Sequence, residues 1–264
     1  MDLELRGKVA LVTGGSRGIG KAIARELALE GMDVAVCARQ RDVLNAAVEE
    51  LAKETGRRVV PLIADTSKAE EVNAMFQDAA GALGRLDVLV NNAALVGGVP
   101  SHDLATVDEA AILGDLNTKF LGYVRCARAA APHMQKNRWG RIINIGGLAA
   151  RTSGGIAGAR NAAVGHLTKT LAAMLGPSGI TVNAIHPGTT PTERTAEGWA
   201  AAAKREGVSL EEYERRLAAT HAIRRIVDAR EIAHLAAFLA SPKSGAITGE
   251  VIAAGGGPSR AVYY

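Results

Sequence analysis

Short apolar runs alternate with amphipathic segments along the whole chain. Seven runs rich in β-branched residues predict strands, at residues 8–13, 33–38, 58–64, 86–92, 141–146, 180–185 and 249–255. Most of these runs are apolar on both faces, as strands buried between two helical layers must be. Helical spacing of apolar residues predicts helices near residues 19–30, 41–54, 67–82, 107–136, 156–175 and 228–240. The alternation predicts a doubly wound α/β fold, with a seven-stranded parallel sheet flanked by helices.

Local sequence signals support several of these boundaries. Gly31 follows the first predicted helix and is a typical stop signal. A serine followed three residues later by glutamate predicts a capping box at two helix starts, Ser67 with Glu70 and Ser209 with Glu212.

The segment from about residue 190 to 223 departs from the alternation, because it reads as helical and contains no strand. Such an insertion at the carboxyl edge of a sheet usually covers a ligand pocket. We therefore expect one domain over residues 1–264, with a helical substrate lid at about 190–223.

Composition narrows the class of partner. The formal charge of +4 comes from 31 basic and 27 acidic residues scattered along the chain, which argues against nucleic-acid binding and suits an anionic small molecule. No apolar run approaches the roughly 18 residues of a membrane span, and the N-terminus lacks the apolar core of a signal peptide, so we expect a cytoplasmic protein without a membrane partner. Cys37 and Cys126 lie in apolar segments without metal-ligand or redox spacing, which predicts buried reduced thiols and no metal site.

The first predicted strand runs directly into the sequence TGGSRGIG, residues 13–20, and a helix follows. Its glycines allow a tight turn in which backbone N–H groups approach phosphate oxygens, and the helix N-terminus points at the negative charge. A glycine pattern alone is weak evidence, but the strand before and the helix after favour a dinucleotide site.

Later motifs extend this signal along the chain: Asp65 in ADTS, NNAA at 91–94, DLN at 115–117, RIINIGG at 141–147, HPGTTPT at 186–192 and ITGEVIAAGGG at 247–257. With the glycine turn, they resemble the short-chain dehydrogenase/reductase family over nearly the whole chain. The resemblance implies a Rossmann-like fold and an oxidoreductase acting on a small molecule. It also implies a cofactor site made by the turn residues Gly14, Ser16, Arg17, Gly18, Ile19 and Gly20, by Asp65 and Asn91 at the adenosine end, and by Pro187, Gly188 and Thr192 at the nicotinamide.

The end of the second predicted strand bears on the choice of cofactor. Where an NAD-preferring relative would carry an aspartate for the ribose 2′-OH, this chain has Ala38. Arg39 and Arg17 supply two guanidinium groups that can bracket a 2′-phosphate. We therefore favour NADP and leave NAD open; in the alternative interpretation both arginines are solvated surface residues.

The catalytic positions depart from the family that the chain resembles. There, a tyrosine and a lysine four residues later protonate the oxygen that hydride transfer leaves behind, and a serine holds the carbonyl. Matching AAV at 162–164 and LTKTLA at 167–172 puts Ala157 at the tyrosine position and Asn161 at the lysine position. RIINIGG puts Gly147 at the serine position, which leaves Asn117 as the retained member.

No other tyrosine fills the vacancy on this helix. The chain has Tyr123, which we expect to pack or bond structurally, and three more at positions 213, 263 and 264. We therefore expect a non-standard proton donor.

Several polar residues fall where the resemblance places the substrate. Arg151 and Ser153 follow the fifth predicted strand, and Arg160 adjoins Asn161. Arginine does not donate a proton at neutral pH, but it can stabilise an oxyanion or bind a carboxylate. A salt bridge at the surface or a subunit interface is an equal alternative for each arginine. For His186 we expect a structural hydrogen bond.

Three functions remain open at this point. The first is an NADP(H)-dependent oxidoreductase acting on a small carbonyl or conjugated enone. The second is a non-redox enzyme, a lyase or hydrolase, that uses the same pocket. The third is a catalytically inactive nucleotide-binding protein. The resemblance also implies a homo-oligomer, a dimer or tetramer, paired through the helices at 107–136 and 156–175, on which the tail at 260–264 could dock.

Overall fold

The computed structural model describes residues 1–95, 104–152 and 156–257, and its centre is one sheet of seven parallel strands. The strand order is β3-β2-β1-β4-β5-β6-β7. The bounds are β1 (Val9–Thr13), β2 (Asp33–Ala38), β3 (Val59–Ile63), β4 (Val88–Asn91), β5 (Gly140–Ile145), β6 (Ile180–Pro187) and β7 (Val251–Ala254). All neighbouring strands pair in parallel, which confirms the predicted doubly wound fold.

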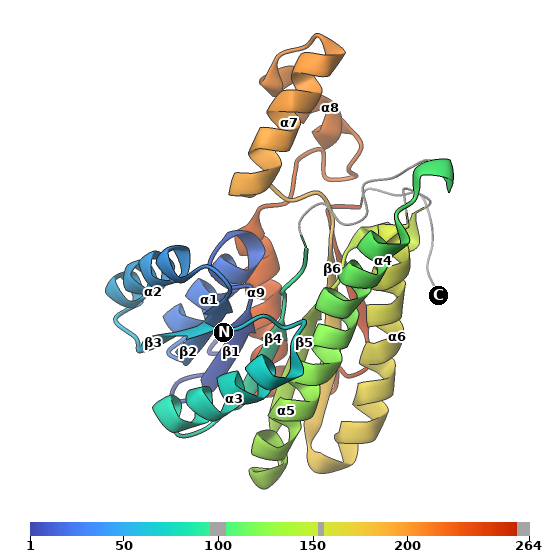
Figure 1. Cartoon of the computed structure of the whole chain (residues 1–264). Helices are drawn as coiled ribbons and strands as arrows, with labels where there is room; N and C mark the ends of the chain where they lie inside the picture. Colours follow the sequence, from blue (N-terminus) through green and yellow to red (C-terminus); the bar gives the residue numbers. More distant parts are fainter. Residues whose placement is uncertain (96–103, 153–155, 258–264) are drawn as a thin grey trace.

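Helices cover both faces of the sheet (Figure 1). One layer consists of α1 (Gly18–Leu29), α2 (Arg41–Thr55) and α9 (Ala229–Ala240), and the other of α3 (Ala69–Leu83), α5 (Gly122–Lys136) and α6 (Ala157–Leu175). Each layer packs its apolar stripe on the fully buried side chains of the strands, so the protein has a core on either side of the sheet. Cys37 and Cys126 are buried free thiols in the second core, as expected.

β1 and β4 are neighbours in the sheet. Strands β2 and β3 are added on the β1 side of this pair, and strands β5 to β7 on the β4 side. The loops that follow these two strands therefore diverge at the carboxyl edge and leave a crevice between them, the usual ligand site of open α/β sheets. Above this edge stand α7 (Glu193–Glu206) and α8 (Leu210–Ala219), which project away from the sheet (Figure 1). They occupy most of the segment expected to be a lid; that role stays a prediction.

The segment predicted as one helix over 107–136 is built from three pieces. These are α4 (Glu109–Leu116), a π-helical segment η2 (Asn117–Leu121) and α5. A π-bulge inserts a residue into the helical repeat, and such bulges are frequent at functional sites. The short 3₁₀ segments of the described chain are η1 (Leu104–Thr106), η3 (Leu148–Arg151), η4 (Gly176–Ser178) and η5 (Pro242–Ser244).

One predicted capping box is wrong and the other is half formed. α3 begins at Ala69, because the backbone N–H of Ser67 donates to the Asp65 carboxylate instead of Ser67 capping the helix. Ser209 does cap α8, accepting from the backbone N–H of Glu212. The Glu212 carboxylate binds two arginines of its own helix and does not reach back.

No helix in the described ranges has both the length and the apolar character that a membrane crossing requires.

Candidate functional site

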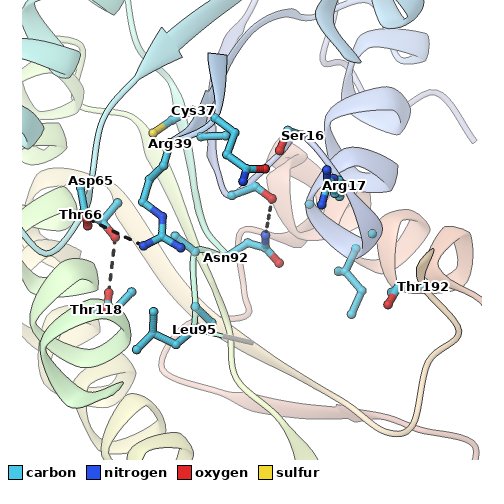
Figure 2. A pocket seen from close by; sticks show the side chains of 18 of the residues that line it. Ser16, Arg17, Cys37, Arg39, Asp65, Thr66, Asn92, Leu95, Thr118 and Thr192 are labelled. Carbon is cyan, nitrogen blue, oxygen red and sulfur yellow. Dashed lines mark hydrogen bonds and ion pairs between the residues drawn. The ribbon is translucent and has the colours of Figure 1, made fainter. Parts of the chain in front are cut away.

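A cavity of about 720 Å³ lies in the crevice at the carboxyl edge of β1, β2 and β4. Its wall begins at the glycine turn after β1, follows the end of β2 and the loop after β3, and continues along the loop after β4. The start of α7 covers one side and Arg160 of α6 lies at the far end. Figure 2 shows these walls with the side chains that point into the space between them.

The glycine turn is closed by the loop after β4. The Asn92 amide Nδ2 donates to the carbonyls of Thr13 (3.1 Å) and Gly14 (3.0 Å). Gly14 has φ +64°, and a Cβ there would lie 2.9 Å from the backbone Cα of Ala93. Only glycine satisfies both conditions, so the turn is compact enough for backbone N–H groups to face a diphosphate. The residues present thus fit a dinucleotide.

One acidic side chain already uses a donor of this turn. The backbone N–H of Gly18, the first residue of α1, donates to Glu193 Oε2 at 3.2 Å. Thr192, whose hydroxyl caps α7, also lines the cavity. The start of the α7–α8 pair therefore sits on the phosphate-binding end of the cavity.

The part of the cavity expected to hold the adenosine contains Arg39 and Asp65. Arg39 extends from the end of β2 along the cavity, and its Nη1 lies 3.9 Å from Asp65 Oδ2 (Figure 2). Burial alone would raise the pKa of Asp65, but hydrogen bonds from Ser67 and the charge of Arg39 lower it, so the carboxylate is ionised. Arg17 is exposed on the turn, and Ala38 leaves the end of β2 without a carboxylate.

The positions assigned to the missing catalytic residues lie together in the structure. Gly147 follows β5, and a Cβ there would lie 2.9 Å from Nδ2 of Asn161. Asn161 is buried on α6, one helical turn after Ala157, where the helix begins. Gly147 and Asn161 therefore lie side by side, and the assignment of these three positions to the family's catalytic residues stays a prediction.

The two arginines have protein partners. Arg160 forms a buried ion pair with Asp115 of α4, and it also lines the cavity. Arg151 donates to the backbone carbonyl of Val251 on β7 at 2.9 Å. Ser153 lies outside the described residues, as does the tail at 260–264.

Asn117 does not face this cluster. Its side-chain oxygen accepts from Arg125 at 2.8 Å, and its backbone carbonyl accepts from the same guanidinium. Two residues later in η2, Lys119 reaches across to β5 and donates from Nζ to the Gly146 carbonyl at 2.9 Å. Lys119 is 4% exposed. Burial, with a smaller effect from the Arg160 charge, lowers the pKa of Lys119 to about 7.

Two further residues complete the surroundings of Gly146. The Tyr123 hydroxyl donates to the carbonyl of Ile145 at 2.9 Å in a fully buried position, which confirms the expected structural role. The ring of His186 packs where a Cβ on Gly146 would lie. Neither ring nitrogen of His186 has a hydrogen-bond partner among the described residues, so the expected structural hydrogen bond was wrong. Burial lowers the pKa of His186 to about 4, which keeps the ring neutral.

Known proteins resemble the chain over almost all of its length. The family model described as enoyl-(acyl carrier protein) reductase matches residues 14–259. The chain belongs to the short-chain dehydrogenase/reductase family. Among curated relatives, the short-chain reductase protein NovJ of Streptomyces niveus is 38% identical over 94% of this chain and 93% of its own. The NADPH-dependent reductase BacG of Bacillus subtilis is 33% identical over 97% and 99%. L-Sorbose reductase from Gluconobacter frateurii, solved with NADPH and L-sorbose, superposes with a TM-score of 0.92 at 29% identity, over 99% of this chain and all of its own.

In this short-chain dehydrogenase/reductase, most residues implied by the family resemblance line the cavity: Gly14, Ser16, Arg17, Gly18, Ile19, Gly20, Arg39, Asp65 and Thr192. Asn91 does not, because its amide is fully buried and donates to Asn144 at 2.9 Å. The next residue, Asn92, lines the cavity instead. Pro187, the last residue of β6, and Gly188, which follows it, lie beside β7 and are not lining residues of the cavity.

Sequence reasoning missed Lys119, although a signal was present. Positions 119, 123, 126, 130 and 134 recur at helical spacing and all face the core. A lysine on the apolar side of such a stripe is a buried charge, which proteins seldom keep without a use. Among the described residues, no group of three or more histidine, cysteine or acidic side chains could hold a metal ion.

Proposed function

We propose that this protein is an NADPH-dependent reductase that transfers a hydride to a small carbonyl or conjugated enone. The observation that carries the cofactor assignment is the charge pattern of the cavity wall, which contains Arg17 from the glycine turn, Arg39 from the end of β2, and the uncharged Ala38. A 2′-phosphate gains two charge-assisted partners there, whereas a free 2′-OH gains no carboxylate acceptor at the end of β2. The printed names of BacG and of the L-sorbose reductase complex, both with NADPH, support the same choice.

The absent tyrosine bears on the chemistry. Bound NADPH would supply the hydride, held by the glycine turn and by the arginines. The chain must supply a proton from a group other than a tyrosine on α6, because Ala157 and Asn161 occupy the relevant turn. Asn161 packs against Gly147 at the end of β5, where a Cβ on Gly147 would lie 2.9 Å from the side-chain amide nitrogen of Asn161.

A titration of protein into NADPH and NADH, followed by nicotinamide fluorescence, tests the cofactor. Arg39→Ala should weaken NADPH at least tenfold and leave NADH unchanged, because one charge-assisted contact of about 1.5 kcal/mol is lost. Arg230→Ala, an exposed arginine of α9 outside the cavity, is the matched control. Equal affinity of the wild-type protein for both nucleotides would refute the assignment.

Incubation with a panel of ketones, hydroxyketones and enones, using NADPH deuterated at C4, tests the reaction. Transfer of deuterium to a product carbon is the expected result. Binding of NADPH without transfer would favour a non-redox enzyme or an inactive nucleotide-binding protein. Absence of binding would overturn the proposal as a whole.

Assembly and location stay predictions. A homo-oligomer paired through α5 and α6 is consistent with exposed Leu113, Leu121 and Met174 on these or adjoining helices. Light scattering on the purified protein measures the mass directly. Fractionation of the source cells tests the cytoplasmic location.

A further inference from the structure

Lys119 is held at the carboxyl end of β5 by a geometry that leaves little freedom. It lies one turn before Tyr123 on the same helical face, and the two side chains donate to successive carbonyls, those of Gly146 and Ile145. Lys119 is 4% exposed, and the bond to Gly146 is its one hydrogen bond within the described ranges. The ammonium is therefore held in place, and most of its N–H groups donate to no partner within the described ranges.

No carboxylate neutralises this amine directly. Asp115 is engaged by Arg160, and within the described ranges Lys119 makes no ion pair. Burial disfavours the charged form and Arg160 adds repulsion, while Asp115 acts weakly in the opposite sense. Neutral His186 and, beyond it, Arg151 complete the titratable groups around Gly146. A fold that needed only packing here would carry an apolar side chain.

Unpartnered polar atoms collect around the same point. Asn161 Oδ1 and both ring nitrogens of His186 are buried without hydrogen-bond partners among the described residues. Asn161 borders Gly147 and His186 borders Gly146, so these atoms and the Lys119 ammonium surround one peptide group. Buried donors and acceptors that lack protein partners indicate a place for a polar ligand or ordered water.

This peptide group is only partly covered by the protein. Gly146 and Gly147 are themselves only half-buried, and neither has a side chain to cover the carbonyl that holds the amine. Thr118, the neighbour of Lys119 in η2, lines the cavity beside Thr66, whose hydroxyl donates to the Thr118 carbonyl at 3.4 Å, and Arg160 also lines the cavity. Lys119 itself is not a lining residue, so its ammonium lies behind the wall to which its neighbour Thr118 belongs.

We propose that Lys119 is the catalytic residue that gives the proton to the substrate oxygen, in place of the tyrosine absent from α6. This rests on the proposed reductase function. As hydride adds to the carbonyl carbon, the C=O π electrons move to oxygen, and oxygen takes a proton from the Lys119 ammonium. The nitrogen keeps the electron pair of the broken N–H bond and becomes a neutral amine, which still donates a hydrogen bond to the Gly146 carbonyl. Water then returns a proton to the amine. One carbonyl, one NADPH and one proton give one alcohol and one NADP⁺.

The direction of the pH dependence follows. Reduction needs the ammonium and should fall as pH rises through about 7, the lowered pKa of Lys119. Oxidation of the alcohol needs the neutral amine and should rise over the same range. His186, with its pKa lowered to about 4, stays neutral over this range and does not produce the inflection.

Three variants test the assignment: Lys119→Met, Lys119→Arg and the control Lys169→Met, an exposed lysine of α6. We expect Lys119→Met to bind NADPH within about threefold of wild type and to lose 10²–10⁴-fold in kcat, the usual contribution of a general acid. Lys119→Arg keeps the charge but should remain slow, with no inflection near pH 7. Lys169→Met should match wild type. Unchanged kcat and pH profile in Lys119→Met would overturn the assignment.

A second readout does not depend on turnover. In protein labelled with ¹³C at lysine Cε, the resonance that Lys119→Met deletes should titrate near pH 7 and shift when NADPH is added. Titration near 10.5 without response to NADPH would overturn the role of Lys119. Failure of the wild-type protein to transfer deuterium to any compound in the panel would refute the reductase function instead, and the resonance would still decide whether Lys119 belongs to the cofactor site.

Discussion

The stability of Lys119→Met as a function of pH measures how strongly the fold opposes a charge at the end of β5. The pKa of Lys119 falls from an ordinary 10.5 to about 7 on burial. Such a difference corresponds to about 5 kcal/mol of folding free energy when the folded lysine is fully protonated. Methionine has a similar length and no charge, and it forfeits one hydrogen bond to Gly146 worth about 1 kcal/mol. The variant should therefore be about 4 kcal/mol more stable than wild type at pH 6.

The advantage should shrink as pH rises. Between the folded and unfolded pKa of Lys119, the unfolded chain binds a proton that the folded chain does not, so wild-type stability increases with pH across this window. From pH 6 to pH 9 the wild type should regain about 3 kcal/mol relative to the variant. Urea unfolding followed by far-UV circular dichroism at pH 6, 7, 8 and 9 gives this difference directly.

The comparison contains its own control, because burial, the largest cause of the lowered pKa of His186, is the same in both proteins. Lys169→Met, at an exposed site, should show a constant offset from wild type at every pH. A difference between Lys119→Met and wild type that does not change with pH would mean that the amine is not desolvated, and the reasoning would fail.

Three other substitutions have definite expected outcomes. Glu193→Gln removes a negative charge from the phosphate turn and should tighten NADPH binding three- to tenfold in a fluorescence titration; weaker binding would contradict this. Gly14→Ala places a side chain at positive φ against the loop after β4 and should abolish NADPH binding, while circular dichroism shows a folded protein. Asp115→Asn leaves the buried guanidinium of Arg160 unpaired and should destabilise the protein by about 3 kcal/mol in urea, with Asp115→Asn/Arg160→Met recovering most of the loss; equal stability of the single variant would refute a buried pair.

The architecture was readable from the sequence because each element carries its own signal. All seven apolar runs were predicted as strands and none as a helix. The glycine turn marked the connection between the first strand and the first helix. The prediction failed where a boundary depended on competition between side chains. At the start of α3, the Asp65 carboxylate accepts a hydrogen bond from the backbone N–H of Ser67, and Ser67 does not cap the helix. The Glu71 carboxylate accepts from the backbone N–H of Asp65.

The catalytic end could be predicted less well, for a geometric reason. A π-helical segment shifts the direction of side chains by about one residue, so the motif that predicts Asn117 does not show that Lys119, two residues later, reaches β5. Lys119 meets Gly146 across 27 positions of sequence, a contact that exists only after the sheet has formed. The choice between Asn91 and Asn92 is of the same kind, since strand alternation sends one amide into the core and the other into the cavity.

The bond between Glu193 and Gly18 leads us to predict an order of ligand binding. Because α7 begins at Glu193, a diphosphate that captures the Gly18 N–H also detaches the first turn of α7 from the phosphate turn. The part of the cavity wall that would contact a substrate then reaches its final arrangement only after the nucleotide has bound. Binding should therefore be sequential, with the nucleotide entering first and leaving last. Calorimetry should detect no heat from substrate added to nucleotide-free protein, and a measurable heat there would contradict the sequence of binding.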